Sequence, residues 1–202
     1  MSRKEAILQA ATQLFSLKGF KEVSMSELAE ITGVAQGTIF YHFKNKEGLF
    51  LSTLEKTRED IVRQFEDYIH KNHFENGLGM VEGALTFYLY LAGNIGDVFL
   101  LLHRYDAYQF AEINPICREH LEGIYNCLLD ILEGAVLKGQ ADGSIRDLPA
   151  RKTAWILFSM VDGLARFETY NLYDAGALYS ELISSCRRIL QKENREDRDC
   201  RC

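Results

Sequence analysis

The sequence has little of what β-rich, secreted or membrane-spanning proteins need. Only two prolines occur among its 202 residues, and no strongly alternating Val/Ile/Thr run is present, so the pattern predicts an all-α fold. The N-terminal residues contain no apolar segment typical of an export signal, and the longest uncharged apolar stretch, about residues 98–102, is too short to cross a bilayer. Five cysteines without an export signal fit a reducing compartment. We therefore expect a cytoplasmic helical protein that does not enter a membrane.

Signals for catalysis and for bound cofactors are also missing. No phosphate-cradling glycine loop and no nucleophile motif is present. His70 and His73 lie three residues apart at an expected helix end, and Cys200 and Cys202 close the sequence, but neither pair has an identifiable third metal ligand. We expect no metal, no cofactor and no enzyme activity. The alternative class is an enzyme that acts on an apolar substrate. Turnover assays would distinguish it from a protein without enzyme activity.

Charge is distributed unevenly along the chain. The net charge is −6, yet residues 1–47 contain six basic and five acidic residues, so the acidity belongs to the remainder. With 47% apolar residues the chain can bury a substantial core. A nearly neutral N-terminal part on an acidic body predicts weak non-specific DNA affinity, so DNA binding would depend on specific contacts.

The pattern at residues 24–50 is typical of a helix-turn-helix. Ser24 and Glu27 have capping-box spacing, and Gly33 suits the left-handed residue that ends a first short helix. Ile39 and Phe43 lie four residues apart and predict the buried face of a second helix. This leaves small or neutral hydrogen-bonding residues for the outer face, and no acid occurs from Val34 to Lys46. An exposed helix of this composition, followed by two lysines, suits a polyanion.

Hydrophobic periodicity and helix caps predict the other helices. Ser2 and Glu5 open a helix that Gly19 stops, Asn45 caps a long helix that reaches about residue 72, and Asn114-Pro115 opens another. The remaining boundaries are a break at 75–79, helices at 80–92 and 97–110, a helix end near 138, a loop at 139–148, and helices from about 149 to 170 and from 174 to 191. Residues 192–202 lack apolar periodicity, which predicts a disordered tail.

Residues 4–50, and above all the run from Gly33 to Phe50 with its Tyr41-His42-Phe43 followed by Lys44-x-Lys46, resemble the DNA-binding domain of the TetR family of bacterial transcription regulators. The resemblance implies an all-α fold of nine helices: a three-helix DNA-binding domain at 1–46 and a six-helix effector-binding and dimerisation body at 47–191. It also implies a ligand-responsive, sequence-specific regulator, and we expect a repressor, although the sequence does not separate repressor from activator.

The resemblance assigns DNA contacts position by position. In the family, matching positions at the start of the second helix often meet bases or phosphates, those near its end reach the backbone or base edges, and a lysine at the start of the fourth helix meets a phosphate. The residues so assigned are Gln36, Gly37, Thr38, Tyr41, His42 and Lys46. We add Ser24 and Ser26, which can donate to phosphate, and Lys44, which follows the second helix of the helix-turn-helix. The alternative is a helix-turn-helix used only for packing. Ala35 stands where many members have Ser or Thr, which removes a helix cap.

The resemblance also implies an effector pocket in the body. The candidates are aromatic side chains and a few polar ones: Phe87, Tyr88, Phe99, His103, Tyr108, Trp155, Phe158, Asp162 and Arg166. Such aromatics at helical spacing also fit plain core. Asp162 and Arg166 lie four apart and can satisfy each other, whereas a free Arg166 would bind a carboxylate. These residues suggest a small apolar effector, with acyl compounds as one candidate class. The alternative is a body that responds to a protein partner.

The last two helices resemble the dimer interface of the family. Their apolar residues include Ala154, Leu157, Val161, Leu178, Leu182 and Ile183. A two-fold dimer would place two recognition helices about one DNA turn apart, so we expect a homodimer on an approximately palindromic operator.

Overall fold

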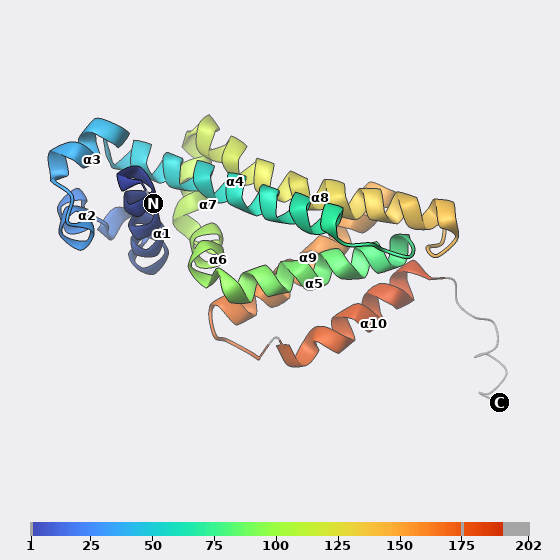
Figure 1. Cartoon of the computed structure of the whole chain (residues 1–202). Helices are drawn as coiled ribbons and strands as arrows, with labels where there is room; N and C mark the ends of the chain where they lie inside the picture. The colour runs from blue at the N-terminus through green and yellow to red at the C-terminus, as the bar shows by residue number, and fades with distance from the viewer. Residues whose placement is uncertain (1, 175, 192–202) are drawn as a thin grey trace, which may run out of the picture. The chain divides into compact units, whose positions relative to one another are not determined.

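The computed structural model describes residues 2–174 and 176–191. Within these ranges the chain forms ten α-helices and one 3₁₀ turn, and no strand (Figure 1). The all-α prediction is confirmed, with one helix more than the nine expected. The helices are α1 (Arg3–Glu22), α2 (Met25–Thr32), α3 (Gln36–Phe43), α4 (Lys46–Lys71), α5 (Gly77–Asn94), α6 (Gly96–His103), α7 (Tyr105–Ile113), α8 (Pro115–Asp142), α9 (Ala150–Thr169) and α10 (Tyr179–Leu190), with the 3₁₀ turn at Gly176–Leu178.

The chain divides into two compact units. The first comprises Met1–Glu66 and Leu91–Cys127, and the second comprises Asp67–Tyr90 and Leu128–Cys202. In the first unit, α1, α2 and α3 lie together and α4 extends away from them (Figure 1). The expected boundary between a DNA-binding domain at 1–46 and a body at 47–191 remains a prediction. The predicted disordered tail at 192–202 lies outside the described residues.

Local capping defines ends of α1 and α2 as the sequence predicts, and α3 is held by its buried face. At the start of α1, the Glu5 amide donates to the Ser2 hydroxyl and the Ser2 amide donates to the Glu5 carboxylate, which completes the capping box. Gly33 ends α2 with a left-handed φ of 65°. Ile39 and Phe43 of α3 are buried, so α3 is held to the unit by one face only.

Asn45 links α3 to α4, as predicted. Its side-chain oxygen accepts from the Gly48 amide at 2.7 Å. Leu49, Phe50 and Leu54 of α4 are fully buried. At the other predicted cap, the Asn114 side-chain oxygen accepts from amides in the first turn of α8.

Two predicted boundaries around the second unit are wrong. α5 begins at Gly77, inside the expected break, and α8 continues to Asp142, past its expected end near 138. A Cβ atom on Gly77 would lie 2.0 Å from the Gly139 amide nitrogen, so both glycines serve close helix packing rather than chain breaks. The Asp142 carboxylate accepts from the Gly77 amide at 2.7 Å, which holds the two helix ends together.

The expected single helix at 97–110 is two helices. Arg104, between α6 and α7, has extended backbone angles of φ −71° and ψ 140°, which no helix accommodates. This break accounts for the tenth helix. The final expected helix from 174 begins instead with the short 3₁₀ turn, and α10 starts at Tyr179.

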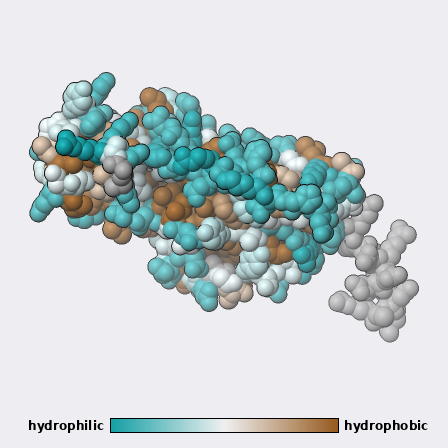
Figure 2. Space-filling view, viewed as in Figure 1, coloured by the Kyte–Doolittle hydropathy of each residue, from teal (hydrophilic) through white to brown (hydrophobic). Residues whose placement is uncertain are grey.

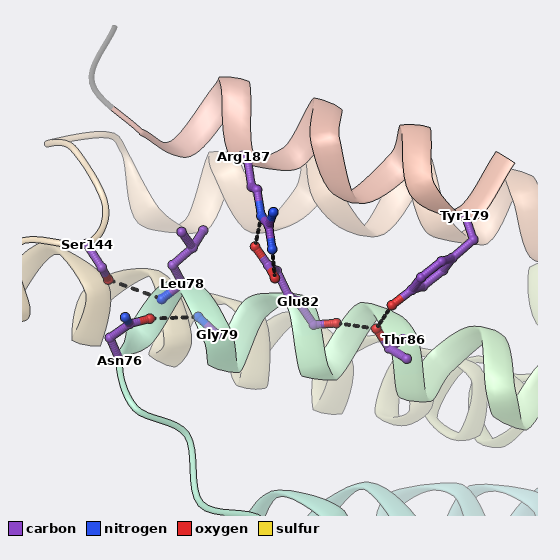
Figure 3. A network of polar contacts seen from close by, with 8 residues as sticks. All are labelled: Asn76, Leu78, Gly79, Glu82, Thr86, Ser144, Tyr179 and Arg187. Carbon is purple, nitrogen blue, oxygen red and sulfur yellow. Dashed lines mark hydrogen bonds and ion pairs between the residues drawn. The ribbon is translucent and has the colours of Figure 1, made fainter. Parts of the chain in front are cut away.

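Helix α10 is fastened to α5 within the second unit. The Arg187 guanidinium donates to both carboxylate oxygens of Glu82, at 2.5 and 2.8 Å, and the Tyr179 and Thr86 hydroxyls lie 2.9 Å apart (Figure 3). Two-point guanidinium–carboxylate geometry fixes orientation as well as distance. A displacement of Glu82 in α5 would therefore act directly on Arg187 in α10.

No single helix in the described ranges is long and apolar enough to cross a membrane. Only the pair α5 and α6 has sufficient combined length and composition, and it is bent by 98°. The face of the molecule in Figure 2 is mainly hydrophilic, with hydrophobic residues in separate patches.

Candidate functional site

Helix α3 presents an outer face that is polar and open to solvent. Gln36, Gly37 and His42 are exposed, Thr38 is half-buried, and Tyr41 is 84% exposed. The buried positions of the same helix, Ile39 and Phe43, secure its opposite side. Because α3 has eight residues and is held on one side, its outer face can enter a groove about as wide as the DNA major groove.

Gly37 occupies an open position in the first turn of α3. A Cβ atom added there would meet nothing within 4 Å in the chain. The backbone of Gly37 has no positive φ, so neither backbone conformation nor internal packing requires glycine at this position. The missing side chain instead allows an external surface to approach the backbone closely.

Lys44 lies in a strained turn between α3 and α4. Its φ of 62° and ψ of −50° describe a γ-turn, and the Asn45 amide donates across it to the Phe43 carbonyl at 2.7 Å. A Cβ on Gly48 would lie 2.2 Å from the same Phe43 carbonyl oxygen, so the junction leaves room only for glycine there. This turn joins α3 to α4 within two residues and leaves the Lys44 side chain exposed beside α3.

Lys46 is a structural brace within the first unit. Its ammonium donates to the carbonyls of Lys21 and Val23, each at 3.0 Å, and lies 4.9 Å from the centre of the Phe20 ring. Two of its three N–H groups are therefore used inside the chain. The predicted phosphate contact of Lys46 stays a prediction, and the structure adds a second role that the sequence did not indicate.

The two candidate serines differ in what they do inside the chain. The Ser24 hydroxyl accepts from the Glu27 amide at 3.1 Å and so caps α2. The Glu27 side chain pairs with Lys18 of α1. The Ser26 side chain is exposed in the first turn of α2. Ala35 at the start of α3 makes no side-chain cap, as its methyl group requires.

Three effector candidates meet in the second unit. The Tyr88 hydroxyl donates to the Asp162 carboxylate at 2.6 Å, and the Phe158 ring packs edge-on against Tyr88 with ring centroids 5.7 Å apart. Tyr88 and Phe158 are buried. Arg166 lies 3.7 Å from the Asp162 carboxylate and is exposed. The two charges are thus close enough to attract each other, and carboxylate binding by Arg166 stays a prediction.

The other five candidates fall into different surroundings. In the first unit, Phe99 and His103 are buried and in ring contact at 6.1 Å, and the Tyr108 hydroxyl lies 2.6 Å from the Tyr125 hydroxyl. In the second unit, Phe87 stacks on Tyr68 with centroids 4.1 Å apart. The last of the five, Trp155, is 49% exposed, so it faces solvent rather than the interior of the chain.

The predicted interface residues are mostly core of the single chain. Ala154, Leu157 and Val161 of α9 are at most 1% exposed. Leu182 and Ile183 of α10 are also buried, and among the six residues only Leu178 is exposed. The exposed apolar residues of α9 lie beside them at Trp155, Ile156 and Phe167, and the exposed Tyr170 follows the helix. The sequence signal that could have identified these exposed residues is that α9 has two apolar sides, because only one of them can pack on its own chain.

Thiol and imidazole groups are not arranged for chemistry in the described residues. Burial raises the pKa of Cys117 and of Cys186 to about 11, so both thiols stay protonated. Cys127 is half-buried. Among the residues that the structure describes, no three His, Cys, Asp or Glu side chains converge as metal ligands. Cys200 and Cys202 lie outside those residues.

Comparisons with known proteins agree with this architecture. Residues 7–53 match the family model described as "Bacterial regulatory proteins, tetR family". The fatty acid metabolism regulator protein of Bacillus subtilis (strain 168) is 29% identical over 183 residues, which cover 88% of this chain and 90% of that protein. The HTH-type transcriptional repressor BepR of Brucella suis biovar 1 (strain 1330) is 28% identical over 79% of this chain and 77% of its own length.

A solved structure shows the same fold. The crystal structure of the transcriptional regulator FadR from Bacillus subtilis in complex with stearoyl-CoA superposes with a TM-score of 0.72 at 23% identity, and the match covers 92% of this chain and 98% of that chain. The matched relatives are regulators and not enzymes. Residues 7–53 thus match the DNA-binding region of the TetR family of bacterial regulatory proteins, and over most of its length the chain resembles transcription regulators.

Proposed function

We propose that this protein is a homodimeric repressor that binds an approximately palindromic operator through α3 and releases it when a long-chain acyl effector binds the body. The observation that carries the proposal is the outer face of α3. It is polar, free of acids and exposed, and it contains a glycine whose missing side chain nothing inside the chain explains.

The chemistry of α3 suits a DNA groove. The Gln36 side chain carries the amide that can bond adenine at two atoms, and the Tyr41 side chain is 84% exposed. Gly37 permits the backbone to approach the DNA between these side chains. Lys44 adds a positive charge beside α3, where a phosphate would lie.

The exposed apolar stripe of α9 supports a dimer. Trp155 and Phe167 lie at its two ends, with Ser159 and Gly163 between them at successive four-residue steps. A Cβ on Gly163 would meet nothing within 4 Å in the chain. Small residues between two large apolar ones allow a second helix to approach closely, and burying such a stripe favours association. We therefore keep the prediction that the last two helices form the dimer interface. We now assign the contacts to the exposed residues of α9 instead of its buried ones.

The buried candidates of the body suit the apolar part of an effector. Arg166 is paired with Asp162, and the buried candidates are mainly aromatic. A relative that matches most of this chain is a fatty acid metabolism regulator, and a protein with the same fold holds stearoyl-CoA. Both similarities favour an acyl thioester as the first compound to test.

DNA selection followed by fluorescence anisotropy tests the first part of the proposal. We expect the protein to enrich an approximate palindrome whose half-sites lie about one helical turn apart. Tyr41→Ala and Gln36→Ala should each weaken binding about 10-fold, as expected for loss of one groove contact. Gln9→Ala, which removes an exposed glutamine from α1, is the matched control and should bind like the wild type. If no sequence is enriched even at low salt, α3 does not read DNA.

Titration of the DNA complex with stearoyl-CoA tests the second part. Release by stearoyl-CoA, but not by coenzyme A alone or by an acetyl thioester, is the expected result because the apolar chain supplies the affinity. Equal release by coenzyme A alone would assign recognition to the nucleotide instead. If none of these compounds changes DNA affinity, the acyl effector is wrong and a protein partner becomes the alternative.

A further inference from the structure

Helix α1 is interrupted one turn before its end. Gly19 has φ 82° and ψ 167°, well outside helical values. In an unbroken helix, the Phe20 amide would donate to the Ser16 carbonyl four residues earlier. The break therefore leaves this donor and this acceptor to be satisfied by other groups.

Two side chains from the α6–α7 junction satisfy both groups. The Asp106 carboxylate accepts from the Phe20 amide at 3.0 Å, and the Arg104 guanidinium donates to the Ser16 carbonyl at 2.9 Å. The same arginine nitrogen lies 3.4 Å from the Leu17 carbonyl. Arg104 and Asp106 also pair with each other, with Nε and Oδ2 3.6 Å apart. The pair replaces one helix hydrogen bond of α1 with a connection to another part of the first unit.

The backbone conformation and the packing around the break favour glycine at position 19. A Cβ on Gly19 would lie 2.3 Å from the Asp106 carboxylate and 2.7 Å from the Arg104 guanidinium. Beside the break, the Phe20 ring stacks on Phe110 of α7 with centroids 5.5 Å apart. Arg104 and Asp106 are 29% and 23% exposed in their side chains, so their interaction is only partly screened by solvent.

We propose that Arg104 and Asp106 form a clasp that couples the α6–α7 segment to the DNA-binding helices. A shift of the α6–α7 junction moves the end of α1, and with it the link to α2, because the clasp holds donor and acceptor on both sides of the break. When the effector binds, this clasp transmits the structural change to the DNA-binding helices. That regulatory role rests on the proposed function above, whereas the mechanical coupling rests on the contacts of the clasp.

Hydrogen exchange tests the coupling without any effector. Amide exchange in residues 96–113 is measured by mass spectrometry with and without the DNA duplex that selection enriches. The variant is Arg104→Met with Asp106→Ala, and the matched control is Arg118→Met with Glu122→Ala, which removes an exposed ion pair of α8 in the same unit. We expect DNA to slow exchange in 96–113 for the wild type and the control, and not for the clasp variant. No slowing in the wild type, or equal slowing in a folded, DNA-bound clasp variant, overturns the proposal.

A second variant covers the case in which the double variant fails to fold. Asp106→Asn keeps an oxygen that can accept from the Phe20 amide but removes the charge that pairs with Arg104. It should lose part of the DNA-dependent slowing, and an unchanged effect in this variant would count against the clasp.

The effector arm separates the clasp from the proposed function. DNA Kd is measured with and without stearoyl-CoA, and stearoyl-CoA binding is measured directly. If the wild type couples the two ligands within the roughly 5- to 150-fold range typical of allostery, the clasp variant should bind stearoyl-CoA normally while this ratio falls toward 1. A ratio that stays at the wild-type value refutes the signalling role. If stearoyl-CoA does not bind the wild type, the proposed effector is wrong, and hydrogen exchange alone decides on the clasp.

Discussion

Replacing Gly37 with alanine should separate the stability of the protein from its DNA affinity. Gly37 is the second residue of α3, and an added Cβ meets nothing in the chain within 4 Å. In a helix, alanine is favoured over glycine by about 0.5–1 kcal/mol. The substitution should therefore stabilise the first unit slightly while placing a methyl group where the backbone is proposed to approach DNA.

The two effects have opposite signs and measurable sizes. For a chain of this length, about 0.5–1 kcal/mol raises Tm by roughly 1–4 °C. On DNA, a methyl group that holds the helix out of the groove weakens the neighbouring contacts, and we expect Kd to rise about 10-fold, which is about 1.4 kcal/mol. A lower affinity in a more stable protein cannot arise from partial unfolding.

Thermal unfolding and fluorescence anisotropy on the selected duplex check both values. Gly134→Ala is the matched control, because Gly134 lies within α8, is exposed, and also has nothing within 4 Å of an added Cβ. It should raise Tm by a similar amount and leave Kd unchanged. Wild-type DNA affinity in Gly37→Ala would refute the close approach of α3 to DNA at this residue.

Three further substitutions test other parts of the structure. Lys46→Met should lower stability by about 1–2 kcal/mol, since it removes two charge-assisted hydrogen bonds; an unchanged salt dependence of Kd would show that Lys46 braces the fold, whereas a slope reduced by about 0.9 would show a phosphate contact. Ile156→Glu should give a folded monomer with weakened DNA binding in sedimentation and anisotropy measurements, while Ile113→Glu, at an exposed position of α7, should remain dimeric. Burial, followed by the nearby Arg58, lowers the pKa of His120, so the unfolded chain takes up the proton more readily. Stability should therefore fall as the pH drops below the ordinary histidine value of 6.5, and less so in His120→Gln, as urea unfolding at pH 7.5 and 5.5 would show; equal acid sensitivity of the two proteins would contradict this assignment.

Helix ends marked by a local cap were the most predictable part of the fold. The capping box at Ser2, the left-handed Gly33, and the caps at Asn45 and Asn114 all form as the sequence indicates. Each depends on residues within a few positions of one another, so the local sequence contains the whole interaction. The polar outer face of α3 was predictable for the same reason, because Ile39 and Phe43 define its buried side.

Features that depend on distant partners were not predictable in this way. Gly77 suggested a break, but it lies in α5 because Gly139 approaches it closely. The break between α6 and α7 at Arg104 has no glycine or proline to mark it, and its side chain instead contacts Ser16 of α1, 88 residues away. The predicted interface residues of α9 were apolar for packing on their own chain, and sequence periodicity alone does not say which of two apolar sides faces outward.

Arg104 and Lys46, which are far apart in sequence, both donate hydrogen bonds to carbonyls at the end of α1. A helix end carries unpaired carbonyls and a partial negative charge, which cations near it stabilise. Arg104 binds the Ser16 carbonyl just before the break, and Lys46 binds the Lys21 and Val23 carbonyls just after it. The last turn of α1 is thus held from one side by the α6–α7 junction and from the other by the start of α4. Motion of α4 relative to α6 and α7 would act on this turn, which makes it one place in the first unit, beside the direct link from α4 to α3, where a change in α4, α6 or α7 can alter the position of the DNA-binding helices.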